Sequence, residues 1–261
     1  MIHHLNCATF RPLIGAEMVA HCLLVERPDG LLLVDTGFGT GDLADPKRLE
    51  QPFRALTRPT LDPTEPAVAR IRALGLDPAD VTDIALTHLD RDHAGGLSDF
   101  PQARVHVYEA ELEAALKPPT FMEKSRYVPA QWAHGPQWIR HRTAGDAWLG
   151  FSSVTALGDD VILVPLFGHS RGHAGVAVRR PDGGWILHAG DSYFNIGEKN
   201  TPRTCPATLR AFQTVLAQDN KQRHANQERL RDLVSAQGDD LTVFCAHDPT
   251  ELAELAVTPA P

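Results

Sequence analysis

Four side chains of the kinds that bind metal ions fall within six consecutive residues, from His88 to His93. They directly follow residues 81–87, an apolar segment typical of a buried strand. His88 and Asp90 lie two positions apart, so in an extended backbone both side chains point the same way, and Asp92 and His93 can then turn toward a second position. Imidazole and carboxylate groups suit zinc, and also iron or manganese. The alternative interpretation is a solvated polar loop with two incidental histidines.

Three more side chains of these kinds stand where an apolar strand is expected to end. Strand ends at one edge of a sheet are where pockets form in layered α/β folds. A lone histidine there is more often a structural residue, but three such positions beside the six-residue cluster predict a single metal centre. They are His169 after residues 161–167, Asp191 after residues 185–189 and His247 after residues 241–245.

Short apolar segments alternate with amphipathic ones, which predicts a mixed α/β fold. Turn residues separate most of these segments, as in the run from Arg27 to Gly30. Strands are expected at residues 20–25, 31–34, 81–87, 103–108, 161–166, 175–179, 185–189 and 241–245, and helices at residues 64–74, 109–116, 206–218 and 225–236.

A faint internal repeat links the two halves of the chain. Residues 25–37 and residues 178–192 each contain Arg-Pro-Asp-Gly, then an apolar segment, then an aspartate, which is Asp35 in the first half and Asp191 in the second. Each half therefore predicts a hairpin whose second strand ends in a carboxylate. The repeat indicates two similar β-rich halves with a shared site between their strand ends, unless it is a coincidence.

The stretch 117–150 breaks this regular pattern. It is rich in proline and carries Trp132, Trp138 and Trp148. Linkers rarely hold so many large apolar side chains, so we expect an irregular insertion within a single domain that spans residues 1–261. Two interpretations remain open for it: a cover over the pocket, or a contact within a homodimer.

Composition limits the partners and the compartment. With 261 residues, 43% of them hydrophobic, the chain can bury one large core. A net charge of −8 disfavours nucleic acid or an anionic membrane as the main partner. The first residues do not resemble a secretory signal, and the apolar runs are too short to cross a bilayer. Four widely spaced cysteines, without a C-x-x-C pair, fit a reducing cytoplasm.

These motifs together resemble the metallo-β-lactamase superfamily over nearly the whole chain. The family's V-D-T-G context matches residues 34–37, and its H-x-H-x-D-H motif matches residues 88–93 at every position but one. Its G-H-[ST]-x-G-H motif matches residues 168–173. The resemblance implies a four-layer αβ/βα sandwich with two divalent metal ions at one edge.

The same resemblance implies a division of the ligands. One metal ion would be held by His88, Asp90 and His169, and the other by Asp92, His93 and His247, with Asp191 as the bridge. The departure from the family is Asp90, where a histidine is usual. A carboxylate there adds a negative charge and a harder ligand, so zinc is the first expectation and manganese or iron the alternatives.

Other residues near the motifs carry weaker expectations. Asp35 is expected to orient a ligand. Tyr193 could polarise a substrate carbonyl or stabilise an oxyanion, although its spacing from Asp191 differs by one from that of the lactonase branch. His173 is either a supporting or a packing residue, and His188 is expected to be structural. His3 and His4 alternate in an expected edge strand, and a role in the site is not favoured for them. Cys22 and Cys245 are expected to be core thiols.

The expected activity is hydrolysis of an ester-like bond by a hydroxide that bridges two metal ions. Asp92 would also carry the proton to the leaving group. The resemblance to lactonases and glyoxalase-II-like enzymes favours a lactone, ester or thioester of a small molecule. A phosphodiesterase or nuclease of the same fold is the alternative, supported by Asp90, and a metal-binding regulatory module without turnover is a third possibility.

Overall fold

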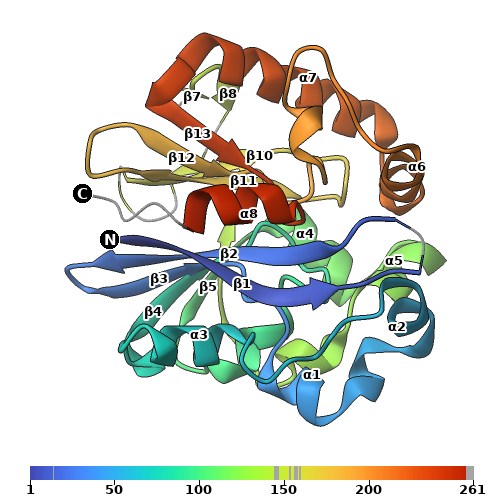
Figure 1. Cartoon of the computed structure of the whole chain (residues 1–261). Coiled ribbons are helices and arrows are strands. Elements are labelled where there is room, and N and C mark those ends of the chain that lie inside the picture. Colours follow the sequence, from blue (N-terminus) through green and yellow to red (C-terminus); the bar gives the residue numbers. More distant parts are fainter. Residues whose placement is uncertain (14, 144–146, 153, 156–157, 159, 257–261) are drawn as a thin grey trace.

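The fold is a sandwich of two β-sheets with helices on its outer sides (Figure 1). The computed structural model describes residues 1–13, 15–143, 147–152, 154–155, 158 and 160–256 of the chain. The strands are β1 (Ile2–Phe10), β2 (Met18–Arg27), β3 (Gly30–Val34), β4 (Val81–Ala85), β5 (Arg104–Tyr108), β6 (Gln137–His141), β7 (Ala147–Trp148), β8 (Phe151–Ser152), β9 (Val154–Thr155), β10 (Val161–Pro165), β11 (Ala174–Arg179), β12 (Trp185–His188) and β13 (Leu241–Phe244). The helices are α1 (Thr40–Ala44), α2 (Gln51–Thr57), α3 (Ala67–Ala73), α4 (Glu109–Leu116), α5 (Phe121–Arg126), α6 (Ala207–Leu216), α7 (Asn220–Gln237) and α8 (Pro249–Ala256).

The first sheet takes its strands in chain order, β1-β2-β3-β4-β5-β6. The pairs from β1 to β3 are antiparallel, and those from β3 to β6 are parallel. The second sheet has the order β13-β12-β11-β10-β9, with β12 and β13 parallel and the other pairs antiparallel. A third, two-stranded ribbon joins β7 and β8.

Alternation along the strands explains the layers. On β3, Leu32 and Val34 pack against the second sheet, whereas Leu31 and Leu33 pack against α3 and α4 on the outside. On β10, Leu163 faces the first sheet and Val164 packs under α7. Because neighbouring side chains in a strand point to opposite faces, a fully apolar strand fits a sheet that is covered on both sides.

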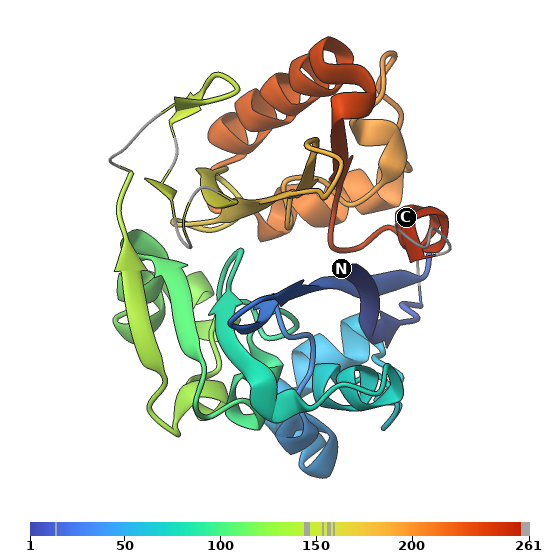
Figure 2. The ribbon, with the colours of Figure 1, turned by 90° about the vertical axis from the view of Figure 1, so that its left-hand side faces the viewer.

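Helices complete the four layers. Figure 1 shows α1 and α3 outside the first sheet and α7 outside the second, whereas α2 and α6 lie beside the right-hand end of the sandwich. After a quarter turn, Figure 2 shows the two sheets facing each other, with the N-terminal strand at their interface. The expected αβ/βα architecture is confirmed. Among the residues that the structure describes, no helix is both long and apolar enough to cross a membrane.

The two repeated segments do form equivalent hairpins. β2 and β3 pair antiparallel around one Arg-Pro-Asp-Gly turn, and β11 and β12 pair antiparallel around the other. Each hairpin lies within a different sheet, and each second strand leads to its aspartate, Asp35 or Asp191. The expected pair of similar hairpins is confirmed.

The stretch 117–150 is more ordered than its composition predicts. It contributes α5, and also β6 as the edge strand of the first sheet. Trp132 is buried against the core between the first sheet and its helices, and Trp138 packs beside it. Trp148 is buried in the core under α7. These tryptophans fill cores and do not cover a pocket. Residues 144–146 lie outside the described part of the chain.

Candidate metal centre

The loop that follows β4 delivers four of the seven expected ligands. β4 is a central strand of the first sheet and is buried, so its end is fixed in place. Beyond it, the backbone turns tightly, because the amides of His93 and Ala94 both donate to the carbonyl of Asp90, at 2.9 and 3.0 Å. The turn separates His88 and Asp90 from Asp92 and His93, as the spacing predicts.

The other three expected ligands arrive from the second sheet. His169 follows β10, Asp191 follows β12 and His247 follows β13. Gly168 lets the backbone turn before His169, because it adopts a φ of 133° and its Cα lies against the backbone of Arg223. A Cβ at this position would come within 2.3 Å of the Arg223 nitrogen, so only glycine fits without displacing the turn.

The structure brings all seven residues together in two groups. His88, Asp90, His169 and Asp191 form one, and Asp92, His93 and His247 form the other. In each group, one ligand atom per residue lies within 4.8 Å of the others. These groups reproduce the division that the resemblance implies, with Asp191 assigned to the first group.

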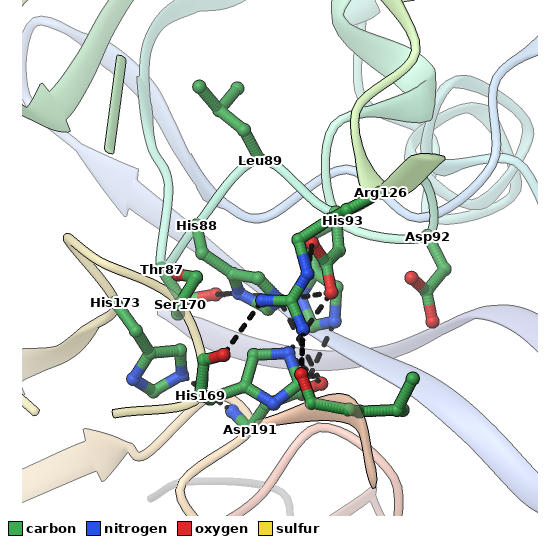
Figure 3. Close-up of polar contacts among 12 residues, drawn as sticks. Thr87, His88, Leu89, Asp92, His93, Arg126, His169, Ser170, His173 and Asp191 are labelled. Atoms are coloured by element: carbon green, nitrogen blue, oxygen red, sulfur yellow. Dashed lines mark hydrogen bonds and ion pairs between the residues drawn. The ribbon is translucent and has the colours of Figure 1, made fainter. Parts of the chain in front are cut away.

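Asp191 lies close to histidines of both groups, and Figure 3 shows it below His88 and His93. Its carboxylate oxygens lie 3.7 Å from Nε2 of His88 and 3.3 Å from Nε2 of His93. They also lie 3.3 Å from Nε2 of His169 and 3.1 Å from Nε2 of His247. One carboxylate that reaches imidazoles of both groups has the position that a bridging ligand needs.

Several buried polar atoms without a hydrogen-bond partner make this site suitable for metal ions. Nε2 of His88, Nε2 of His93 and Oδ1 of Asp191 are buried without a hydrogen-bond partner. Buried polar atoms of this kind are costly unless something else binds them. Two groups of imidazole and carboxylate donors, with lone pairs turned inward, match what divalent metal ions require.

Ionisation within the cluster is strongly coupled. Burial favours the neutral form of Asp191, but His247, His93 and His169 outweigh it and hold the pKa of this carboxyl well below its usual range. Burial likewise disfavours the charged form of His93, yet Asp191 and Asp35 raise the pKa of its ring well above the ordinary value. The raised pKa values of His93 and His247 thus favour protonated rings beside ionised carboxylates in the metal-free cluster, and a metal ion would displace those protons.

Supporting residues fix which ring nitrogen faces the centre. Nδ1 of His93 lies 2.8 Å from Asp35, which also accepts from the amide and the hydroxyl of Thr87, at 2.8 and 2.7 Å. Nδ1 of His247 donates to the carbonyl of Val19 at 2.7 Å. A donor bond at Nδ1 leaves Nε2 free as a ligand. The expected orienting role of Asp35 agrees with these contacts.

His173 is a supporting residue as well. Its Nδ1 lies 2.9 Å from the carbonyl of Leu166, and its Nε2 accepts the amide of Asp191 at 2.8 Å. Burial, together with His88 and His169, keeps the pKa of this ring well below the ordinary value. A neutral ring with one donor and one acceptor nitrogen therefore fixes the backbone at the central aspartate.

Sequence reasoning missed Glu111 on α4. Its buried carboxylate accepts from the amides of Leu89 and Gly172, at 3.1 and 2.9 Å. It also accepts from the hydroxyls of Ser170 and Tyr127, at 2.7 and 3.2 Å. Leu89 lies between two ligands of the first loop, and Ser170 follows the ligand of the second, so Glu111 joins the two loops. Nothing in the local sequence separates it from the other glutamates of its helix.

The sequence analysis also did not single out two arginines that lie near the candidate metal centre. Arg91, within the ligand loop, donates to the carbonyl of Leu49 at 2.9 Å and to that of Arg126 at 3.2 Å. Arg126, at the end of α5, places its Nε 3.4 Å from Asp90. Arg126 lies 36 positions from Asp90 in the sequence, too far for any local pattern to connect them.

The expectation that Tyr193 faces the substrate is wrong. Its ring is buried in the core of the second sheet, and its hydroxyl donates to Glu251 at 2.9 Å. The chain turns after Asp191, so that the side chain two positions later points into the core, away from the centre. Burial, together with Glu251, raises the pKa of this phenol well above its ordinary value. Tyr193 therefore packs against β13 and binds Glu251 of α8, which is a structural role.

The remaining histidines lie away from the metal groups. His188 is buried and donates to the carbonyl of His21 at 2.5 Å, in keeping with its expected structural role. His4, on the edge strand β1, lies 2.7 Å from the ring of His21, and His3 pairs with Glu26 at the surface. Cys22 and Cys245 are fully buried free thiols, as expected.

A cavity of about 260 Å³ opens beside the metal groups. Asp90, Asp92, Asp191 and His247 line it together with Arg126. Helix α5 supplies part of the remaining wall, so one segment of the 117–150 stretch does border the pocket. The other polar lining residues are Thr57, Arg91, Glu123, Ser125 and Gln218. The apolar lining residues are Phe10, Met18, Phe53, Leu56, Met122, Phe194, Phe212, Leu216 and Ala217.

Comparison with known proteins agrees with this geometry. A family model for the metallo-beta-lactamase superfamily matches residues 16–247. The chain belongs to the metallo-beta-lactamase superfamily. A probable metallo-hydrolase of Mycobacterium tuberculosis is 43% identical over 98% of this chain and 82% of its own length. At the level of enzyme class, the expected metal-dependent hydrolase is confirmed.

More distant superfamily members include lactonases. The N-acyl homoserine lactonase AttM of Rhizobium radiobacter is 28% identical over 93% of this chain and 87% of its own length. An N-acyl homoserine lactone hydrolase, solved with the product N-hexanoyl-L-homoserine at its catalytic metal centre, shares the fold with a TM-score of 0.75. That structure is 18% identical and covers 97% of this chain and 95% of its own, so the likeness concerns the fold.

Proposed function

We propose that this protein is a dinuclear metal hydrolase that opens the ring of small lactones carrying an apolar acyl chain. The observation that carries the proposal is a pocket in which expected metal ligands and a mainly apolar set of side chains line the same space. An ester or lactone with an apolar tail has the matching distribution of polarity. The similarity to AttM supports an acylated homoserine lactone as the first candidate.

The length of the apolar surface supports a substrate with a tail. A second cavity of about 380 Å³ borders the first, and the two share Met18, Leu56, Thr57 and Phe212. Its other walls include Pro12, Leu209 and Val215. An acyl chain whose ester group lies beside the expected metal ligands could extend along these shared side chains into the second cavity. Each buried methylene would contribute about 0.8 kcal/mol to binding.

The chain's own residues would hold two ions and move a proton. His88, Asp90 and His169 would hold one, Asp92, His93 and His247 the other, and Asp191 would bridge them. Two divalent ions held there would supply a hydroxide nucleophile at neutral pH and would polarise the carbonyl group of the substrate. The carboxylate of Asp92 borders the pocket, so it can take up a proton there and deliver it to the leaving oxygen.

The metal is zinc in this proposal, with manganese or iron as alternatives because of Asp90. A phosphodiester is the competing substrate class, and it would call for cations along the pocket. The two arginines that border the pocket are instead engaged by carbonyl groups: Arg91 by Leu49, and Arg126 by His169. An apolar ester fits this wall better than a nucleic acid backbone.

The test combines metal content with turnover. Purified protein should contain about two metal ions per chain, and Asp191→Ala should lose both metal and activity. Asp182→Ala, in the exposed turn of the β11–β12 hairpin, is the matched control and should change neither. N-hexanoyl and N-decanoyl homoserine lactones would be compared with bis(4-nitrophenyl) phosphate. We expect KM to be lower for the longer acyl chain.

Faster turnover of the phosphodiester would assign the protein to the competing substrate class. A wild-type protein that binds one ion or none after gentle purification would overturn the dinuclear mechanism. In that case a regulatory metal-binding role, without turnover, would become the better explanation.

A further inference from the structure

The guanidinium of Arg126 lies beside one of the metal-ligand carboxylates. Arg126 is the last residue of α5, and Figure 3 shows its side chain reaching into the ligand cluster. Its Nε is 3.4 Å from Oδ1 of Asp90, and only 11% of the Arg126 side chain is exposed. Its Nη1 donates to the carbonyl of His169 at 2.8 Å, and its Nη2 donates to the carbonyl of Leu216.

The two oxygens of Asp90 face different partners. Oδ2 lies 3.0 Å from Nε2 of His169 and 3.4 Å from Nε2 of His88, so it points into the first ligand group. Oδ1 faces Arg126 and has no hydrogen-bond partner in the cluster. One oxygen is therefore directed toward the metal position while the other is held near a fixed positive charge.

Charge explains why the two residues belong together. Asp90, Asp92 and Asp191 place three carboxylates in one largely buried cluster. A buried carboxylate is costly unless an opposite charge lies close to it. Arginine stays protonated at any ordinary pH, so it can supply that charge permanently. Asp90 and Arg126 together carry no net charge, as a single neutral imidazole ligand would.

We propose that Asp90 and Arg126 act as one charge-compensated unit, in which Arg126 is the positioning residue that lets a carboxylate serve where a neutral ligand would otherwise be needed. Arg126 cancels the additional negative charge and holds Oδ1, which leaves Oδ2 to the metal ion. The proposal rests on the proposed function in one respect, namely that metal ions bind at this cluster.

A purely structural role for Arg126 is the competing explanation. Its bonds to the carbonyls of His169 and Leu216 support two loops, and the ligand-loop residue Arg91 in turn donates to the carbonyl of Arg126 at 3.2 Å. In a support role, loss of Arg126 would be harmful whatever residue occupies position 90. In a charge-compensating role, the effect of losing Arg126 must depend on position 90.

A double-mutant cycle separates these explanations. The proteins are wild type, Asp90→His, Arg126→Gln and the double variant. The first readout is the dissociation constant for Zn²⁺, measured by competition with a chelator. Asp90→His leaves the guanidinium unpaired beside a cationic site, so metal binding should weaken about 10- to 100-fold. Adding Arg126→Gln should recover at least about tenfold of that loss.

The second readout is the melting temperature of the metal-free proteins. Asp90→His strands a buried cation and should lower the melting temperature, and the double variant should recover part of the loss. Asp90→Asn, which is isosteric and neutral, provides the same cycle if Asp90→His does not fold. Arg142→Gln is the matched control, because Arg142 is exposed and pairs with Glu109 on α4. It should leave both readouts unchanged in either background.

The outcomes distinguish this proposal from the proposed function. Wild-type protein that binds no metal would overturn both. Wild-type protein that binds metal, with a double variant weaker than Asp90→His alone, would overturn the compensation and leave the hydrolase proposal intact. Recovery of both affinity and melting temperature in the double variant would establish the pair.

Discussion

At the scale of single residues, the ligands and their supports differ in how visible they are in the sequence. Each expected ligand lies in a segment that follows an apolar strand, and that pattern singled out the seven residues that the structure gathers in the two groups. Glu111 and Arg126 contact the ligands or their loops only through the tertiary fold, so no spacing could reveal them. The prediction that Tyr193 faces the substrate was wrong, because closeness in sequence to Asp191 does not set the direction of a side chain after a turn.

Asp35 offers a test at this scale. Asp35→Asn removes the charge that holds Nδ1 of His93, while asparagine still tolerates the positive φ of 56° at this position. We expect zinc binding to weaken about 10- to 100-fold, since partners of ligand histidines have effects of this size. Chelator competition would measure it.

The control for Asp35→Asn is Asp29→Asn, in the exposed turn of the same hairpin. It should bind zinc like the wild type. An unchanged zinc affinity in Asp35→Asn would show that the orientation of His93 does not depend on this carboxylate.

At the scale of secondary structure, the apolar segments predicted their elements well. β3, β5 and α4 lie within one or two residues of the expected ranges, because their side chains face cores on regular periods. The sequence analysis did not predict α1, α2 or α8, and it also missed β6 and α5. β6 is a half-exposed edge strand without a continuous apolar run, and α5 is a short helix with Phe121 and Met122 exposed. The sequence signal that predicts an element comes from the periodic burial of its side chains. β6 and α5 bury few side chains, so their signal is weak.

Helix α4 carries a prediction at this scale through Glu111. Glu111→Ala would leave the amides of Leu89 and Gly172 and the hydroxyl of Ser170 buried without their acceptor. Each such group costs about 1–3 kcal/mol. We therefore expect the free energy of unfolding of the metal-free protein to fall by about 3 kcal/mol or more, as measured by urea denaturation.

Glu113→Ala is the matched control, since Glu113 is exposed on the same helix. Its free energy of unfolding should stay within about 0.5 kcal/mol of the wild type. Equal stability of the two variants would mean that water replaces the carboxylate of Glu111 between the loops.

At the scale of the whole molecule, both sheets contribute to an aromatic cluster where they meet. Rings of His4 and His21 from the first sheet pack against Phe244 of the second, with centroids 5.4 and 4.1 Å away. His188 of the second sheet joins them and donates to the carbonyl of His21. Burial, with help from His188 and His3, lowers the pKa of His4 from 6.5 to about 4.

This cluster predicts a loss of stability in acid. Because the folded protein keeps His4 neutral and the unfolded chain protonates it below pH 6.5, the stabilisation is present above pH 6.5. It disappears as the pH falls toward 4. We expect the free energy of unfolding to decrease over this range, and to decrease less in His4→Gln. Histidines of the two groups with raised pKa values, such as His93, act in the opposite sense. The difference between wild type and variant is therefore the quantity to measure.

Urea denaturation of metal-free protein at pH 7, 6 and 5 would provide that difference. A His4→Gln variant with the same pH dependence as the wild type would assign the acid sensitivity to other groups. The prediction of a single domain over residues 1–261 remains a prediction, to be checked by whether unfolding is one transition in the same experiment.

The ligands come from both sheets. His88, Asp90, Asp92 and His93 belong to the β4 side, and His169, Asp191 and His247 belong to the β10–β13 side. A break in the chain between β6 and β7 would thus leave neither fragment with a complete set for either ion. Metal binding would then hold the two fragments together, and reassembly of the fragments would depend on the metal concentration. In the proposed enzyme, the metal ions would therefore also link the two sheets of the sandwich.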